Sequence, residues 1–388
     1  MKFPTEITSL FLATSLLCGC TAIGDYMLGT DNNEPPVPLQ DFDATTEVKT
    51  LWSRDIGDGG GRGGSGLTPA LADGRIYAAE ADGDVVALNA ITGESLWRTD
   101  TEITISGGPG TGDGLVVVGS EDGEIVALRS QDGLPLWGAQ VSSEVLAPPR
   151  VADGIVVVRT VDGKLFGFAV GTGQRRWVYD RSVPVLSLRG TAAPALNDGL
   201  VIGGFDSGRL IALGIQDGQV VWENRIAVPR GRTELERLVD IDSTPAVIDG
   251  LIYAVTFQGR IAALDATTGA VEWRRDMSSH SGIDVDSDFV FVTDEKGHIW
   301  SLERDTSASS WRQKKLEFRR ATAPRSFADF VVVGDLEGYV HWLRREDGQF
   351  AARARVSSAP IVASPLVGKD LLYIYASDGT IAALRPAE

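Results

Sequence analysis

The chain has 388 residues, a formal net charge of -17, 43% hydrophobic residues and 23% charged residues. This composition is that of a globular protein, and its 45 glycines and 17 prolines indicate many turns. So acidic a protein is a poor non-specific ligand for nucleic acid or anionic membranes. Beyond residue 20, no apolar run approaches the roughly 18 residues that a membrane helix needs.

The first twenty residues have the plan of a secretory signal. Lys2 precedes an apolar stretch at residues 7–17, and LCGC follows at 17–20. Cys18 and Cys20 are the only cysteines, so the body has no disulfide framework, zinc cluster or haem attachment motif. One interpretation is an ordinary signal peptide with incidental cysteines.

The same segment resembles the bacterial lipoprotein signal, in which a cysteine directly after the cleavage site receives lipid. The resemblance implies a signal peptide at residues 1–19 and lipidation of Cys20, and Thr21 in the next position implies the outer membrane. Several acyl chains, at about 0.8 kcal/mol per buried methylene, would anchor the protein stably. Residues 20–46 are polar and rich in turn residues, so we expect a flexible tether there and a folded body at 47–388.

From residue 68 the sequence repeats with a period of about 40 residues. In the clearest copy, TPALADGRIYAAEADGDVVALNAITGESLW, Pro69 lies fourteen residues before Gly83 and Trp97 fourteen after it. Glycines 123, 163, 208, 259, 297, 338 and 379 serve as the same origin in seven further copies. Seven of the eight copies have the proline and six have the tryptophan. The exceptions are Ile283 for proline, Ala352 for tryptophan, and an eighth copy that would need residue 393.

Each repeat contains four short apolar or alternating runs separated by Asp-Gly and Thr-Gly pairs, which supply the positive φ angles of tight hairpins. A four-stranded antiparallel unit of this length is a propeller blade. We therefore predict an all-β, eight-bladed β-propeller. The last copy has no outer strand, while Leu51 and Trp52 precede the first copy, so the N-terminal strand should complete the last blade and close the ring.

No residue pattern points to catalysis or to a cofactor. The glycine-rich segment 57–66 lacks the Gly-Lys-Ser/Thr ending of a phosphate loop, and the three histidines are scattered. Asp284, Asp286 and Asp288 mimic a calcium loop, but no glutamate stands at its twelfth position. We predict no catalytic, metal-binding or cofactor-binding residues.

Loop lengths are more informative. From tryptophan to the next proline the connections are near 10 to 13 residues, except for 17 after Trp52, 17 after Trp177 and 23 after Trp222. These connections share one face of a propeller, and insertions that gather on one face of a repeat scaffold usually bind a partner.

Two of the long connections carry candidate binding residues. In RSVPVLSLRG at 181–190, exposed aliphatic residues beside an arginine suit an interface, unless the leucines fold inward against a blade. In PRGRTELERLVDIDS at 229–243, Thr233 and Glu236 have the spacing of a capping box, and two aspartates follow that are either binding residues or solvated turn acids. The candidate partner-binding residues are Leu186, Leu188, Arg189, Asp240 and Asp242.

The repeat itself points to a family. The patterns ALNAITGESLW, ALRSQDGLPLW, ALGIQDGQVVW and ALDATTGAVEW resemble the repeat of pyrroloquinoline-quinone-type propellers. Fold alone does not choose function. Quinoprotein dehydrogenases on this scaffold carry an adjacent cysteine pair and calcium-binding acids, and the mature body here has no cysteine.

Together with the lipoprotein signal, the LSLRG and LVDIDSTP segments resemble the BamB family of outer-membrane lipoproteins. The resemblance implies a non-catalytic scaffold of the β-barrel assembly machinery, lipid-anchored at the outer membrane and facing the periplasm. It would bind the POTRA domains of BamA, and through BamA the other lipoproteins of the complex, and would assist folding and insertion of outer-membrane proteins. In that family the partner surface includes the residues matching Leu186, Leu188, Arg189, Asp240 and Asp242. The alternatives are a quinone-dependent dehydrogenase or quinone-binding propeller, and a scaffold of another envelope complex.

Overall fold

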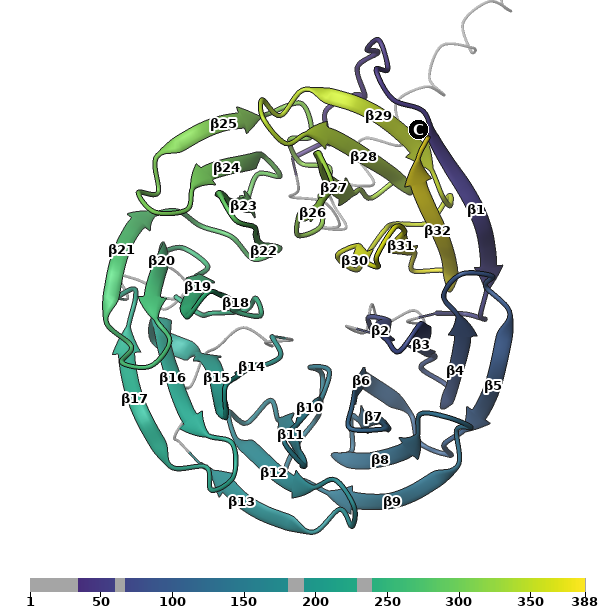
Figure 1. Ribbon diagram of the computed structural model, residues 1–388, viewed down its shortest axis with the longest axis vertical. Helices are drawn as coiled ribbons and strands as arrows, with labels where there is room; N and C mark the ends of the chain where they lie inside the picture. The colour runs from purple at the N-terminus through teal and green to yellow at the C-terminus, as the bar shows by residue number, and fades with distance from the viewer. Residues whose placement is uncertain (1–33, 60–66, 181–191, 229–238, 388) are drawn as a thin grey trace, which may run out of the picture. The chain divides into compact units, whose positions relative to one another are not determined.

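The computed structural model describes residues 34–59, 67–180, 192–228 and 239–387. Residues from Val37 onward form one compact unit, in which eight four-stranded antiparallel sheets stand as blades around a central axis (Figure 1). The predicted eight-bladed all-β propeller is confirmed. None of the described residues belongs to a helix with the length and apolar character needed to cross a membrane.

The blades follow chain order, and each runs from the axis outward. Blade one contains β2 (Ala70–Ala72), β3 (Arg75–Ala79), β4 (Asp84–Asn89) and β5 (Ser95–Asp100). Blade two contains β6 (Ile105–Gly112), β7 (Leu115–Ser120), β8 (Glu124–Arg129) and β9 (Pro135–Gln140). Blade three contains β10 (Arg150–Ala152), β11 (Ile155–Arg159), β12 (Leu165–Ala169) and β13 (Arg175–Tyr179). Blade four contains β14 (Ala195–Asn197), β15 (Leu200–Phe205), the short 3-10 helix η1 (Asp206–Gly208), β16 (Arg209–Gly214) and β17 (Val220–Arg225).

The second half of the ring has the same plan. Blade five contains β18 (Ala246–Ile248), β19 (Leu251–Val255), β20 (Arg260–Asp265) and β21 (Val271–Asp276). Blade six contains β22 (Gly282–Val285), β23 (Phe289–Thr293), β24 (Ile299–Glu303) and β25 (Ser309–Gln313). Blade seven contains β26 (Arg325–Phe327), β27 (Phe330–Gly334), β28 (Tyr339–Arg344) and β29 (Phe350–Arg355). Blade eight contains β30 (Leu366–Val367), β31 (Leu372–Tyr375), β32 (Thr380–Pro386) and, as its outer strand, β1 (Val48–Asp55).

The strand register defines the two faces of the ring. In blade three, Arg159 at the end of β11 pairs with Leu165, which in turn pairs with Tyr179 at the end of β13. The turn between the second and third strands therefore lies on the same face as the connection that leaves the outer strand. We call this the connection face and the opposite one the hairpin face. All three long connections found in the sequence leave an outer strand on the connection face.

The tryptophans join neighbouring blades. Seven of them donate their indole N–H to a backbone carbonyl of the next blade over 2.7–3.2 Å: Trp52, Trp97, Trp137, Trp177, Trp222, Trp273 and Trp311. In six of the seven contacts the indole ring also covers the hairpin glycine of that blade, and in the blade that Trp273 contacts Ser307 takes the place of the glycine. Gly218 has φ +67, and a Cβ there would lie 2.7 Å from Cδ2 of Trp177. The repeated Gly-x-x-x-Trp pattern thus reflects contacts between neighbouring blades.

The N-terminal strand closes the ring, as predicted. β1 pairs antiparallel with β32, from Val48 opposite Pro386 to Asp55 opposite Thr380. Closure also accounts for Ala352. A tryptophan at this position of blade seven would need a hairpin between the third and outer strands of blade eight, and those two strands come from opposite ends of the chain.

The chain before β1 also contacts the propeller. The N–H groups of Thr45 and Thr46 both donate to the carbonyl of Ala351, and the ring of Phe42 stacks on Phe350 with centroids 5.2 Å apart. Contacts of the compact unit begin at Val37, whose N–H donates to the carbonyl of Glu317 in the connection between β25 and β26. The sequence prediction drew the boundary of the folded body later, at residue 47.

Candidate interaction site on the connection face

The candidate site lies where blades three, four and five meet on the connection face. Its centre is Arg159, the last residue of β11, which is only 8% exposed. Nη1 of Arg159 donates to the carbonyl of Ala192 over 3.1 Å, and its guanidinium lies 5.4 Å from the ring centroid of Phe205. A buried arginine fixed in this way presents a positive charge that the surrounding structure must balance.

Three carboxylates supply that balance. Burial lowers the pKa of Arg159, and the negative charges of Asp206, Asp242 and Asp240 act in the opposite direction. Asp206 begins η1 in blade four, whereas the other two belong to the connection between blades four and five. We call these four residues the Arg159 cluster.

The sequence V-D-I-D at 239–242 explains how two aspartates reach this place. Val239 and Ile241 are each 1% exposed, and Ile241 packs in the core between blades four and five. A Cβ on Gly204 of β15 would lie 2.3 Å from Cγ2 of Ile241, so the glycine makes room for this side chain. The alternation of apolar and acidic residues anchors the segment through its aliphatic side chains and leaves the acids beside Arg159.

Asp240 and Asp242 have different surroundings. Asp240 is 2% exposed, and its carbonyl accepts a hydrogen bond of 2.9 Å from the N–H of Phe257. Asp242 is partly buried, and its Oδ2 atom has no hydrogen-bond partner within the described parts of the chain. Burial and, after it, the negative charges of Asp240 and Asp206 raise the pKa of Asp242 from 3.8 to about 6, against the lowering effect of Arg159. The cluster therefore holds a carboxylate that lacks full compensation for its lost hydration.

The structure brings together part of the predicted site. Asp240 and Asp242 lie side by side in the Arg159 cluster, while Leu186, Leu188 and Arg189 fall outside the described residues. The capping-box residues Thr233 and Glu236 also fall outside them. Ala192, which follows that first segment, is buried and accepts the hydrogen bond from Arg159.

Sequence reasoning missed Arg159 and Asp206. A signal for Arg159 was present, because it stands four residues before the repeat glycine Gly163. The other seven copies have Ala79, Gly119, Gly204, Val255, Thr293, Gly334 and Tyr375 at that position. Arg159 is the one charged residue among the eight. Asp206 carried no comparable signal, since acidic residues are frequent in these turns.

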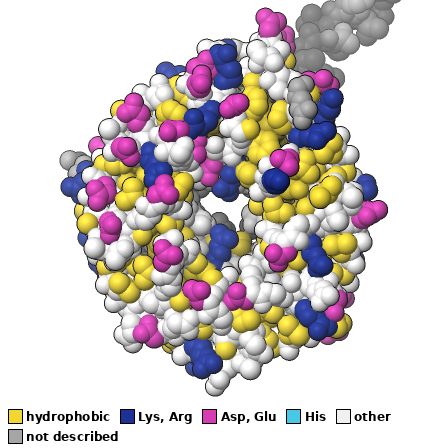
Figure 2. All heavy atoms as spheres, viewed as in Figure 1, with side chains coloured by type: hydrophobic (Ala, Val, Ile, Leu, Met, Phe, Trp, Pro, Cys, Tyr) yellow, Lys and Arg dark blue, Asp and Glu magenta, His cyan; other side chains and the backbone are white. Residues whose placement is uncertain are grey.

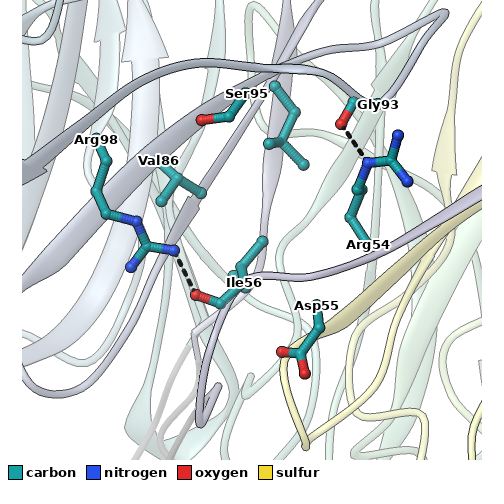
Figure 3. Close-up of a pocket in the computed structure, with 8 residues that line it drawn as sticks. Arg54, Asp55, Ile56, Val86, Gly93, Ser95 and Arg98 are labelled. Carbon is teal, nitrogen blue, oxygen red and sulfur yellow. Dashed lines mark hydrogen bonds between the residues drawn. The ribbon is translucent and has the colours of Figure 1, made fainter.

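A second feature is a pocket of about 150 Å³ at the seam between β1 and blade one (Figure 3). Its two arginines already have partners: Nη2 of Arg98 donates to the carbonyl of Ile56 over 2.6 Å, and Nε of Arg54 donates to the carbonyl of Gly93 over 3.0 Å. Arg98 also forms ion pairs with Glu80 and Asp84. These contacts tie the closing strand to the first blade, and we interpret the pocket as part of that joint.

The aspartates that mimic a calcium loop bind arginines. Asp284 pairs with Arg325 over 2.9 Å, and Asp286 and Asp288 both pair with Arg345. Arg345 lowers the pKa of Asp286, against the effect of burial, and that of Asp288. Within the described residues, no group of three or more His, Cys, Asp or Glu side chains is placed to hold a metal ion.

Comparison with known proteins places the chain in a family. The family model described as outer membrane protein assembly factor BamB matches residues 39–105 and 81–313. The chain belongs to the BamB family. An outer membrane protein assembly factor BamB of Alkalilimnicola ehrlichii is 47% identical over 350 residues, which cover 90% of this chain and 91% of that protein. The factor of the same name from Pseudomonas aeruginosa is 45% identical over 349 residues, covering 90% and 92%.

Solved structures agree with this assignment. The crystal structure of BamB from Moraxella catarrhalis superposes with a TM-score of 0.80 at 29% identity, covering 87% of this chain and 100% of that one. A quinohemoprotein alcohol dehydrogenase from Comamonas testosteroni gives a TM-score of 0.66 at 14% identity, covering 93% of this chain and 82% of that one. At that identity the dehydrogenase shares only the fold with this BamB family member.

Proposed function

We propose that the protein is a non-catalytic scaffold of the outer-membrane β-barrel assembly machinery. In this proposal it binds the periplasmic POTRA domains of BamA and, through BamA, joins the other lipoproteins of the complex. It thereby assists the folding and insertion of outer-membrane proteins. Membership of the BamB family supports this role, because the relatives are named as outer membrane protein assembly factors.

The observation that carries the proposed binding site is the state of Asp242. Its Oδ2 atom lacks a hydrogen-bond partner within the described residues, and burial raises the pKa of this carboxyl to about 6. A cationic group from a partner would supply the missing hydrogen bond and balance the charge. The site lies on the connection face, where the inserted connections are longest. We therefore assign partner binding to Asp240 and Asp242, with Leu186, Leu188 and Arg189 of the preceding long connection.

The proposed membrane anchor belongs to the N-terminal segment. Val37, where the compact unit begins, donates its N–H to the carbonyl of Glu317 in a connection-face segment. In the proposal, Cys20 carries lipid and the protein faces the periplasm. The chain from Cys20 to Val37 spans at most about 60 Å when fully extended, which limits how far Val37 can lie from the outer membrane.

Co-purification from solubilised outer membranes tests partner binding. We expect BamA to be recovered with the wild-type chain and to be lost with the double variant Leu188→Glu, Arg189→Glu, and reduced with Asp242→Asn. Asp73→Asn is the matched control, because it removes the same charge from an exposed hairpin of the opposite face, and asparagine tolerates the positive φ of that residue. Undiminished BamA recovery with a folded Leu188→Glu, Arg189→Glu variant would contradict the assignment.

Two further measurements test the rest of the proposal. Cys20→Ala should release the protein from the membrane fraction while leaving the propeller folded, because only acyl chains would hold it there. Titration with pyrroloquinoline quinone tests the non-catalytic role. Stoichiometric binding together with calcium-dependent oxidation of an alcohol or sugar would overturn that role in favour of a dehydrogenase.

A further inference from the structure

The wall of the central channel carries two arginines at matching positions of opposite blades. We compare the residue that follows the first-strand proline in each repeat, or that follows Ile283 in blade six. In every blade this residue pairs with the equivalent residue of the second strand, so all eight lie at the same level along the channel. Around the ring these residues are Ala70, Gly110, Arg150, Ala195, Ala246, Asp284, Arg325 and Leu366. Two long cations therefore stand in a ring of mostly small or apolar side chains.

Arg150 and Arg325 face each other across the axis. They belong to β10 in blade three and β26 in blade seven, which are four blades apart in a ring of eight and lie on opposite sides of the central opening (Figure 1). Figure 2 shows this opening in the space-filling view, with Lys or Arg side chains (dark blue) on its wall. Burial lowers the pKa of Arg150, and the positive charge of Arg325 lowers it further, so the two charges interact.

Both arginines are held by the same contact. Nε of Arg150 donates to the carbonyl of Pro194 over 3.3 Å, and Nε of Arg325 donates to the carbonyl of Pro365 over 3.2 Å. In each case the acceptor is the proline that begins the next blade. This contact uses the Nε–H group. It leaves both terminal nitrogens of Arg150 for another partner, whereas in Arg325 only Nη2 is left, because Nη1 already donates to Asp284.

Among the described residues, the charge at this level of the channel is not balanced. Nη1 of Arg325 pairs with Oδ1 of Asp284 over 2.9 Å, and Oδ2 of Asp284 accepts the N–H of Ser326. No carboxylate of the described residues forms an ion pair with Arg150. At the eight equivalent positions, which are all described, two arginines and one aspartate leave one positive charge, in a protein whose net charge is -17.

We propose that Arg150 and Arg325 form an anion site on the axis of the channel, which binds a small oxyanion of the carboxylate or phosphate class. Guanidinium groups bind such oxyanions through paired, charge-assisted hydrogen bonds. An anion between them screens the repulsion of the two like charges. The small side chains of Ala70, Gly110, Ala195 and Ala246 at the same level leave space for it. This site is separate from the Arg159 cluster, and the proposed partner binding neither requires it nor depends on it.

Isothermal titration of the purified full chain with inorganic phosphate, and separately with succinate, at constant ionic strength tests the proposal. We expect one saturable site per chain for at least one of these probes, and the tighter of the two identifies the class of oxyanion. Arg150→Gln should weaken the affinity about tenfold or more, since it removes charge-assisted hydrogen bonds, and Arg150→Lys should weaken it less. Arg129→Gln is the control for net charge, because Arg129 is an exposed hairpin residue paired with Asp132.

Several results would overturn the site. These are the absence of saturable binding of both probes, equal affinities of wild type and a folded Arg150→Gln variant, or an equal loss with Arg129→Gln. If Arg150→Gln does not fold, a crystal of the wild-type protein soaked in selenate decides the question. An anomalous peak between Arg150 and Arg325 supports the site. If selenate peaks appear elsewhere in the same crystal but none appears between these two arginines, the site is refuted.

Discussion

Replacing Asp242 by asparagine should make the free protein more stable at neutral pH. Burial raises the pKa of Asp242 from 3.8 to about 6, so the folded state holds this proton more tightly than the unfolded state. The protonated Asp242 therefore contributes its full stabilisation of the folded state below about pH 4, and this contribution is lost as the pH rises through about 6. Above the pKa of both the unfolded and the folded state, the ionised carboxylate lowers the free energy of unfolding by up to about 3 kcal/mol relative to a neutral group.

The asparagine side chain would remove that charge while keeping the shape of the aspartate, although its amide still needs hydrogen bonds. We therefore expect Asp242→Asn to raise the free energy of unfolding at pH 7.5 by about 1–2 kcal/mol, which for a propeller of this size corresponds to roughly 1–3 °C in Tm. Thermal unfolding followed by circular dichroism between pH 4.5 and 8 measures this. The difference in Tm between variant and wild type should be smallest at pH 4.5 and reach a plateau above pH 7.

The same substitution should weaken partner binding, because it removes the charge that a cationic partner group would neutralise. A gain in stability together with a loss of binding separates an interaction role from a structural one. Asp73→Asn on the hairpin face should leave BamA recovery unchanged. An Asp242→Asn variant that is less stable than wild type at pH 7.5, or whose Tm difference does not vary with pH, would refute the reasoning, because it would mean that the native site stabilises the ionised carboxylate.

Two further predictions concern packing and the Arg159 cluster. Gly218→Ala should lower the free energy of unfolding in urea by about 1–3 kcal/mol more than Gly154→Ala does. Both glycines have positive φ, but only a Cβ at 218 would clash with Trp177. Equal losses of stability would exclude the tryptophan contact as the reason for glycine at 218. Arg159→Gln should cost about 3–5 kcal/mol, since it leaves buried carboxylates without their arginine, and should raise the pKa of Asp242 further; a carboxyl titration by NMR that shows an unchanged or lower pKa would contradict this.

The fold was predictable because one repeat of about 40 residues describes the chain from residue 68 onward. Proline, glycine and tryptophan at fixed offsets set the strands, and each blade has the four strands that the repeat predicts. Ring closure followed from counting, since one outer strand was missing at the end and one was left over at the beginning. The packing of Val37–Thr46 was not predictable in this way. It rests on backbone hydrogen bonds and one aromatic contact, which leave no periodic pattern in the sequence.

The candidate site was predictable in part for a related reason. Connection lengths identify the face and the segment that carries Asp240 and Asp242, because an insertion changes the spacing between the tryptophan of one repeat and the proline of the next. The partner of these aspartates comes from another blade, and a distance along the chain does not reveal which blades meet. Arg159 stands more than eighty residues before Asp242, and only the folded ring brings the two charges together.

Departures from the repeat fall into two kinds, and the structure separates them. Ala352 replaces a tryptophan where the neighbouring hairpin does not exist, so ring closure explains it fully. In blade six, Asp284 follows the Ile283 that replaces proline, and it binds Arg325 and the N–H of Ser326 in the next blade, which is again a structural role. Arg159 has no such explanation, because the other copies fill its position with uncharged residues and a buried arginine costs free energy unless it is balanced. The repeat does not require this buried charge, and acids from two other parts of the propeller surround it. A binding site therefore explains Arg159 better than the needs of the fold do.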